Sequence, residues 1–136
     1  MTKLSIVVAS HRLDKLLEAA ILASTCAALN WEGELFFTFW GLFALRKGLE
    51  PEGVSSDYSQ YEKPLLDAIR SERLPKWREL IVKAVETGRV RVYACSTTLE
   101  TFGIKKDDLE EFVEDIVGAA TFLSKAKDSN VSLFIS

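Results

Sequence analysis

The chain has 136 residues, of which 48% are hydrophobic and 27% charged, a balance typical of a soluble globular protein with a single domain, residues 1–136. A formal net charge of −3 and the lack of a Lys/Arg run disfavour a nucleic-acid binder. Hydrophobic runs fall short of the roughly 20 residues that span a bilayer, so membrane contact is not expected. Because no secretion signal is recognisable, we expect a cytoplasmic protein.

The first 29 residues predict a strand followed by a helix. Residues 3–9 are β-branched and almost continuously apolar, which is typical of a strand buried in a parallel sheet. After a turn at 10–12, apolar residues recur at helical spacing over 13–29. This helix carries a second apolar stripe, formed by Ala19, Leu22, Cys26 and Leu29. A helix that is apolar nearly all round is buried on both sides, so we expect another subunit to cover this stripe in a homo-oligomer.

The middle of the chain predicts a second strand and several short helices. Residues 34–40 form a strongly aromatic strand, followed by Gly41 and a short helix over 42–47. Residues 49–63 are rich in Ser, Gly and Pro and predict a loop, whose length is typical of functional or mobile segments. Helices are expected over 64–70 and 75–87.

The last third predicts two more strands. Residues 89–94 form the third strand, and Thr97 with Glu100 reads as a capping box for a short helix. A longer helix is expected from Asp107 or Asp108 to about 125, with its acidic residues Glu110, Glu111, Glu114 and Asp115 on a solvated face, and 131–135 predict a final strand. Strands alternating with helices indicate an α/β three-layer sandwich, with a mostly parallel central sheet flanked by helices on both faces.

The carboxyl ends of parallel strands form one rim, where ligands bind in such sheets. The predicted strand ends bring Ser10 and His11, Trp40 and Gly41, and Cys95 and Ser96 to this rim. These residues are therefore the predicted lining of a site.

Cys95 is the main candidate for chemistry because it stands between a strand and a helix start. A helix N-terminus lowers a thiol pKa, and the thiolate is the reactive form. Backbone N–H groups of Ser96, Thr97 and Thr98 would bind an anionic sulfur adduct. The alternative is that Cys95 packs as a small apolar residue at a strand end.

The other candidate residues have simpler interpretations. Cys26 lies within the first predicted helix and is read as a packing residue. His11, the single histidine, is a candidate helper of the thiol, although a solvent-exposed turn residue is the favoured reading. No metal-ligand spacing or nucleotide-binding motif occurs, so we expect neither a metal nor a cofactor.

Two longer segments, FFTFWGLFALRK (36–47) and ACSTTLETFGIKKDDL (94–109), resemble the DsrE/DsrF-like sulfur-relay family in its peroxiredoxin-like branch. LDKLLEAAILA (13–23) and GAATFL (118–123) are similar to family stretches as well, so the resemblance spans nearly the whole chain. The branch has small residues in place of His11 and Arg12, so no role for His11 follows from it. The 49–76 connection also lacks the Met-rich character expected there.

The resemblance implies a small α/β sandwich, a homo-oligomer, and a Cys95 that carries sulfur as a persulfide or thiosulfonate between protein donors and acceptors. Two alternatives stay open. A thiol peroxidase would need a base or Arg near Cys95 and a resolving thiol. A non-catalytic oligomeric scaffold would leave Cys95 as a packing residue with an ordinary pKa.

Overall fold

The computed structural model describes residues 1–51 and 53–136 and contains one five-stranded sheet. The strands are β1 (Lys3–Val8), β2 (Glu32–Phe37), β3 (Val90–Cys95), β4 (Val113–Val117) and β5 (Val131–Ile135). They lie in the order β4-β3-β2-β1-β5, and every neighbouring pair is parallel. The α/β class and the parallel sheet predicted from the sequence are confirmed.

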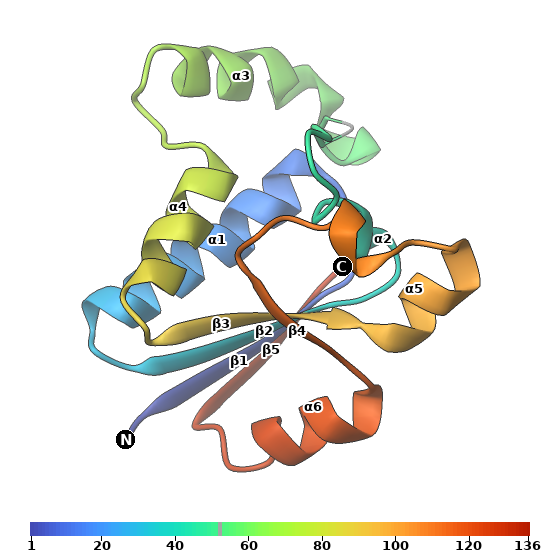
Figure 1. Ribbon diagram of the computed structural model, residues 1–136. Coiled ribbons are helices and arrows are strands. Elements are labelled where there is room, and N and C mark those ends of the chain that lie inside the picture. Colours follow the sequence, from blue (N-terminus) through green and yellow to red (C-terminus); the bar gives the residue numbers. More distant parts are fainter. Residues whose placement is uncertain (52) are drawn as a thin grey trace.

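Helices cover both faces of the sheet, as Figure 1 shows. They are α1 (Leu13–Ala28), α2 (Trp40–Phe43), α3 (Glu62–Arg70), α4 (Trp77–Glu86), α5 (Ser96–Phe102) and α6 (Ala119–Ala126), with 3₁₀ turns η1 (Ser56–Tyr61) and η2 (Lys106–Asp108). The helices α1 and α4 lie on one face and α6 on the other, while α2 and α5 stand at the carboxyl ends of the strands (Figure 1). The last residues of the strands therefore lie at this edge, next to α2 and α5.

The alternation of side chains along each strand divides the core between the two faces. Gly33 of β2 faces α1, since a Cβ at that position would lie 3.1 Å from the Cys26 sulfur. Phe36 faces the opposite way and stacks on Phe122 of α6, with 4.6 Å between ring centroids. In β3, Val90 packs towards α1, whereas the ring of Tyr93 lies 5.2 Å from the Lys125 ammonium of α6.

The predicted helix over 107–125 is wrong. This segment contains the 3₁₀ turn η2, the edge strand β4 and the shorter helix α6. An edge strand exposes polar residues such as Glu114 and Asp115 to solvent, and these imitate the polar side of an amphipathic helix. Gly118, which has an extended backbone and caps α6, marks the break.

The start of the helix after Cys95 also differs from the prediction. Cys95 is itself the N-cap of α5, and no side-chain hydrogen bond caps this helix. The predicted capping box of Thr97 and Glu100 is therefore wrong, because the strand passes into the helix two residues earlier than the Ser/Thr pattern suggested.

The second apolar stripe of α1 has a cover within the chain. Ala19 and Cys26 are buried, and α1 packs extensively against α4. Leu22 and Leu29 of the same stripe remain exposed. The Cys26 sulfur packs against Gly33 and Val90 of the sheet, so two of the four stripe residues are buried within the chain and two face solvent.

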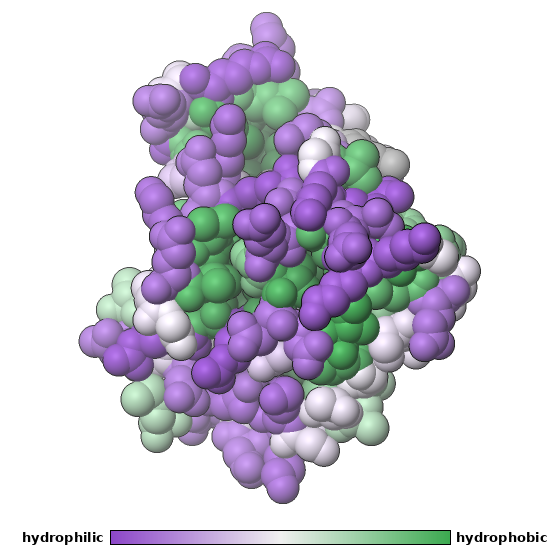
Figure 2. Space-filling view, viewed as in Figure 1, coloured by the Kyte–Doolittle hydropathy of each residue, from purple (hydrophilic) through white to green (hydrophobic). Residues whose placement is uncertain are grey.

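The connection before α4 forms an arm that stands away from the body (Figure 1). The loop predicted over 49–63 contains η1, and its residue 52 lies outside the described residues. None of the α3 residues is fully buried, and a cavity of about 650 Å³ lies beneath this helix, lined in part by Leu13, Leu66 and Trp77. Figure 2 shows hydrophobic residues gathered on the side of α3 that faces the body. The cavity adjoins α1 and α4, whereas the predicted site lies at the strand ends.

Candidate functional site

Cys95 is the last residue of β3 and lies at the carboxyl edge of the sheet. By the alternation along the strand, its side chain points to the α6 face, like that of Tyr93. In β4 it pairs with Val117, which directly precedes Gly118, the N-cap of α6. Only 4% of Cys95 is exposed. The sulfur therefore lies in the interior, between Thr38 at the end of β2 and the first turn of α5, rather than in an open cleft.

Hydrogen bonds to the sulfur decide the acidity of this thiol. Burial alone would raise the pKa of Cys95, but bonds from the side chains of Thr38 and Thr98 and from the backbone of Thr98 and Thr97 hold that pKa below its ordinary value. Each of these donors favours the charged form of the thiol. The arrangement stabilises a thiolate in a largely dry environment.

Thr98 is placed so that its hydroxyl proton is available to Cys95. It is fully buried, and its Oγ1 accepts a hydrogen bond from the backbone N–H of Phe39 at 2.9 Å. A hydroxyl has a single proton and can accept through its lone pairs. Because the Phe39 N–H occupies an acceptor position, the O–H is free to donate to the sulfur.

Thr38 is the residue of the candidate site that the sequence did not reveal. It follows β2 directly, beside Phe37, which pairs with Ala94 in β3. The predicted strand ran to Trp40, but β2 ends at Phe37 and the chain turns at Thr38, whose N–H donates to the carbonyl of Val8 at 3.0 Å. A single hydroxyl within the aromatic run FFTFW was the signal that could have marked this strand end.

The turn from 38 to 41 is tightly held. Phe39 has φ 47° and ψ −122°, a backbone conformation that costs a side-chain-bearing residue about 1–3 kcal/mol. Gly41 is pressed against the end of β1, since a Cβ there would lie 2.8 Å from the carbonyl carbon of Val8. Gly41 therefore permits the close approach of the turn to β1, and a role for it in ligand binding stays a prediction.

The other predicted rim residues occupy different environments. Ser96 begins α5 and is half-buried beside Gly118, and Thr97 is exposed. The Ser10 hydroxyl accepts a hydrogen bond from the Arg12 N–H at 3.2 Å. His11 lies in the same loop between β1 and α1, and a helper role for it stays a prediction.

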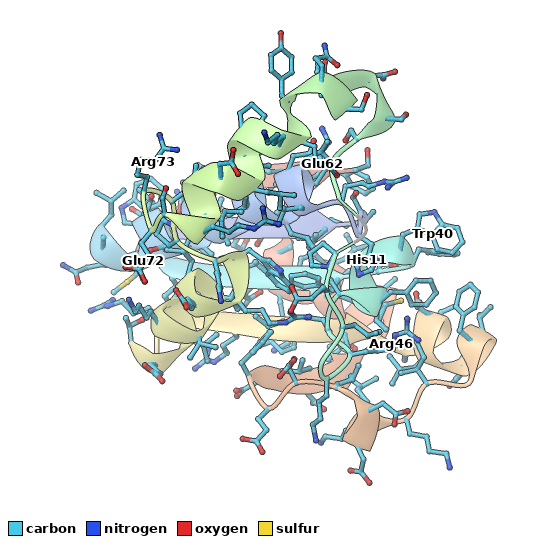
Figure 3. All side chains as sticks on the ribbon, turned by 90° about the horizontal axis from the view of Figure 1, so that it is seen from above. His11, Trp40, Arg46, Glu62, Glu72 and Arg73 are labelled. Carbon is cyan, nitrogen blue, oxygen red and sulfur yellow. The ribbon has the colours of Figure 1, made fainter. Side chains whose placement is uncertain are left out.

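An aromatic patch borders the thiol site. It consists of Phe39, Trp40, Phe43 and Phe102, and the ring centroid of Trp40 is 5.8 Å from each of the other three. Trp40 is about half exposed, and the Arg46 guanidinium stacks over Phe43 at 4.9 Å. Trp40 and Arg46 lie at the opposite end of the molecule from Glu72 and Arg73 (Figure 3). Much of this aromatic surface faces solvent next to the turn that carries Thr38.

The two cysteines are too far apart to act together. The Cys26 sulfur lies beside Gly33 and Val90, at the amino ends of β2 and β3 and on the α1 face. Cys95 is five residues further along β3, about 16 Å away at strand geometry, and faces α6. A disulfide needs Cα atoms within about 7 Å. Burial raises the pKa of Cys26, as expected for a packing thiol.

Within residues 1–51 and 53–136, no group of three or more His, Cys, Asp and Glu side chains is placed to hold a metal ion. No helix among the same residues is long and apolar enough to cross a membrane.

The model of the DsrE/DsrF/DrsH-like family matches residues 1–65 and 57–134, which together make up nearly all of the chain. The chain belongs to this family. The resemblance of the segments around Thr38 and Cys95 is thereby confirmed at the level of the family.

Two curated relatives align over almost their whole length. The sulfur carrier protein DsrE2 of Allochromatium vinosum is 29% identical, with 98% of both chains covered. The uncharacterized protein YrkE of Bacillus subtilis is also 29% identical and covers 96% of this chain and 95% of its own. A sulfur-relay role in general is supported by this relationship.

Solved structures share the fold. The YchN protein of E. coli superposes with a TM-score of 0.68 over 99% of this chain and all of its own, at 19% identity. MTH1491 of Methanobacterium thermoautotrophicum, described as of unknown function, gives a TM-score of 0.58 over 98% of this chain and 97% of its own, also at 19% identity. At such identities the likeness concerns the fold alone.

Proposed function

We propose that this protein is a cytoplasmic sulfur carrier that loads sulfur on Cys95 and passes it to an acceptor thiol. The observation that carries the proposal is the set of hydrogen bonds from Thr38, Thr97 and Thr98 that lowers the pKa of the Cys95 thiol despite its burial. The family and the sulfur carrier DsrE2 among its relatives support the same role.

The transfer needs no external oxidant or reductant. The Cys95 thiolate attacks the terminal sulfur of a donor persulfide, a Cys95–S–S⁻ group forms, and the donor leaves as a thiolate. The acceptor thiolate then attacks the terminal sulfur, and Cys95 leaves as the thiolate that its hydrogen bonds stabilise. With tetrathionate as donor, the same attack gives a Cys95–S–S–SO₃⁻ adduct and releases thiosulfate. When the acceptor thiolate attacks, the hydrogen bonds from Thr38, Thr97 and Thr98 stabilise the Cys95 thiolate that leaves.

Intact-mass spectrometry after incubation with polysulfide, thiosulfate or tetrathionate tests the proposal. Wild type and Cys26→Ser are expected to gain the mass of a sulfur atom or of a thiosulfate unit, and Cys95→Ser to gain neither. Cys26→Ser is the matched control because it removes the other thiol. Equal adduct formation on Cys95→Ser and wild type would show that this assignment is wrong, and a lack of adduct on every variant would favour the scaffold alternative.

The alternative of a thiol peroxidase loses its internal resolving thiol, because Cys26 is on the other face of the sheet. A stopped-flow rate of peroxide reduction no faster than that of a free thiol is the expected result. A rate that far exceeds it, and that disappears in Cys95→Ser, would favour the peroxidase over the carrier.

The aromatic patch is the proposed contact surface for protein donors and acceptors. Exposed aromatic residues next to a reactive group are typical of interaction sites, because they supply large contact area at low entropic cost. We expect Trp40→Ala to slow sulfur transfer to a protein acceptor while leaving loading from polysulfide unchanged. Equal slowing of both reactions would show that Trp40 acts on the thiol site rather than on the partner.

A further inference from the structure

The cavity beneath α3 has the size and the walls of a small-molecule site. Its volume of about 650 Å³ lies within the roughly 300–1,000 Å³ of pockets that hold small ligands. Leu66 and Ile69 of α3 line it from the arm, and Leu13 of α1 and Trp77 of α4 line it from the body. Ligand pockets typically have such apolar walls, with a few polar groups that fix the orientation of the ligand.

Both ends of the arm are fixed to the body, so the cavity is part of the fold. The Gly53 carbonyl accepts a hydrogen bond from the Leu13 N–H at 2.7 Å. The Ser55 hydroxyl donates to the Asp14 carboxylate at 2.9 Å. At the other end, the chain enters α4 at Trp77, of which only 3% is exposed. The arm therefore spans the cavity between two anchored ends.

The indole N–H of Trp77 lacks the acceptor that a buried donor needs. Among the described residues, Nε1 has no hydrogen-bond partner although it is shielded from solvent. Buried N–H groups are nearly always paired in folded proteins, and an unpaired one costs about 1–3 kcal/mol. The neighbouring Arg78 guanidinium lies over the indole ring at 4.8 Å, but it has no acceptor atom. A molecule in the cavity that carries an acceptor would remove this cost.

The charged residues that line the cavity favour a neutral molecule. Arg78 is already paired with Glu50 at 3.2 Å, and Glu62 accepts a hydrogen bond from a backbone N–H at 3.1 Å. Lys76 and Glu79, the other charged lining residues in the described part of the chain, are exposed and have opposite signs. An ion without a partner is costly to bury, and these residues leave it none in the interior.

We propose that the cavity beneath α3 binds a neutral, largely apolar molecule with a carbonyl-type oxygen, which accepts a hydrogen bond from the Trp77 indole. The apolar part of the molecule packs against Leu13, Leu66 and Ile69. Because Nε1 is shielded, binding includes a small rotation of the indole towards the oxygen. The site is independent of sulfur transfer, since the cavity adjoins α1 and α4 and Cys95 faces α6.

Binding of prodan, a neutral fluorescent naphthyl ketone, tests the proposal. Titration of the protein into dilute prodan should give a saturable blue shift of its emission. Leu66→Arg places a charge in the cavity and is expected to weaken binding by about tenfold or more. Asp67→Arg is the matched control because Asp67 is an exposed residue of the same helix. Cys95→Ser and Trp40→Ala should bind as the wild type does, which separates the cavity from the thiol site and from the aromatic patch.

Trp77→Phe separates the hydrogen bond from the packing, because it removes the N–H and keeps an aromatic ring. The competitor is the hydrocarbon counterpart of prodan, in which a methylene replaces the carbonyl. The preference for the ketone over this counterpart should fall by about two- to tenfold in Trp77→Phe. The proposal is overturned if the wild type shows no saturable binding up to about 1 mM protein. It is also overturned if Leu66→Arg and Asp67→Arg bind alike while both are folded by circular dichroism, if Trp40→Ala abolishes binding, or if Trp77→Phe keeps the full preference.

Discussion

The Oγ1 of Thr98 lies 2.9 Å from the backbone nitrogen of Phe39, and this bond directs the threonine proton to the sulfur of Cys95. Replacing Thr98 by valine keeps the shape but removes both bonds. We expect a higher pKa of Cys95, and a loss of about 1–3 kcal/mol in the free energy of unfolding because the Phe39 N–H is left without its partner. Titration by the ultraviolet absorbance of the thiolate and denaturant unfolding measure the two effects. Thr98→Ser should retain most of both, and its failure to do so would show that the methyl group matters more than the hydroxyl.

Thr38→Val is expected to raise the pKa of Cys95 because it removes one hydrogen bond to the sulfur. The loss in the free energy of unfolding should be smaller than for Thr98→Val, because the backbone N–H of residue 38 still donates to the Val8 carbonyl. The same absorbance titration measures it. Thr101→Val is the matched control, since the Thr101 hydroxyl lies on α5 but donates to the carbonyl of Thr97 at 2.7 Å. An equal shift in both variants would mean that the helix, rather than the Thr38 hydroxyl, sets the acidity.

The lowered pKa of Cys95 makes stability depend on pH in a defined direction. The unfolded chain has an ordinary thiol pKa of about 8.5, so between the lowered folded value and this pH the unfolded state binds more protons. The contribution of the thiolate is therefore complete above the ordinary pKa and is lost as pH falls through the folded pKa. We expect the stability of wild type relative to Cys95→Ala to rise from neutral pH to about 8.5.

The stability of wild type relative to Cys26→Ala should fall, rather than rise, as the pH increases. Burial raises the pKa of Cys26, so its neutral form is favoured in the folded state, and stability falls as pH rises above the ordinary thiol value. Urea unfolding over a pH series measures both slopes. Identical slopes for the two alanine variants would contradict the opposite environments assigned to the two thiols.

Gly41→Ala is expected to cost about 3 kcal/mol or more, because the added methyl group would overlap the Val8 carbonyl and β1 cannot retreat from β2 without breaking the sheet. Gly103→Ala is a useful comparison. Gly103 has φ 63° with no atom within 4 Å of an added Cβ, so only backbone strain of about 1 kcal/mol is expected. A loss at Gly41 no larger than that at Gly103 would show that the turn can move away from β1.

Phe39 offers a test of backbone strain. At most positions glycine is less stabilising than alanine, but at φ 47° glycine lacks the steric penalty. The free energy of unfolding of Phe39→Gly should therefore exceed that of Phe39→Ala by about 1 kcal/mol. Comparing these two variants cancels the lost ring contact with Trp40. The reverse order would mean that the turn relaxes once the aromatic ring is gone.

The position of Cys95 between a strand and a helix could be predicted from the sequence because its signals are local. A β-branched run ends at Cys95 and polar residues follow, which is enough to predict a strand, a turn and a cysteine between them. Thr38 could not be found in this way, since the aromatic residues on both sides of it continue the pattern of a strand. The turn there depends on the close approach of Gly41 to β1, a tertiary contact that no local pattern expresses.

The missed strand β4 has a related cause. Its apolar residues are spaced by three and four because the register shift against β3 makes Glu114 an extra, unpaired residue beside the exposed Asp115. Only pairing with β3 distinguishes this strand from a helix, and that pairing includes an irregular register. The α/β class was predicted correctly although β4 was missed, because the other four strands alternate with helices along the chain.

The pairing of β1 with β5 has a consequence for how the chain reaches its structure. Lys3 and Asn130 exchange hydrogen bonds across 127 positions, and residues 4–8 of β1 pair in register with residues 131–135 of β5. Contacts this distant in sequence require the closure of a very long loop before they contribute any stability. Proteins rich in such contacts fold slowly, so we place β5 among the last strands to join the sheet during folding. Until then β1 itself is an open edge, and a newly made chain is at its most vulnerable to pairing with the wrong neighbour.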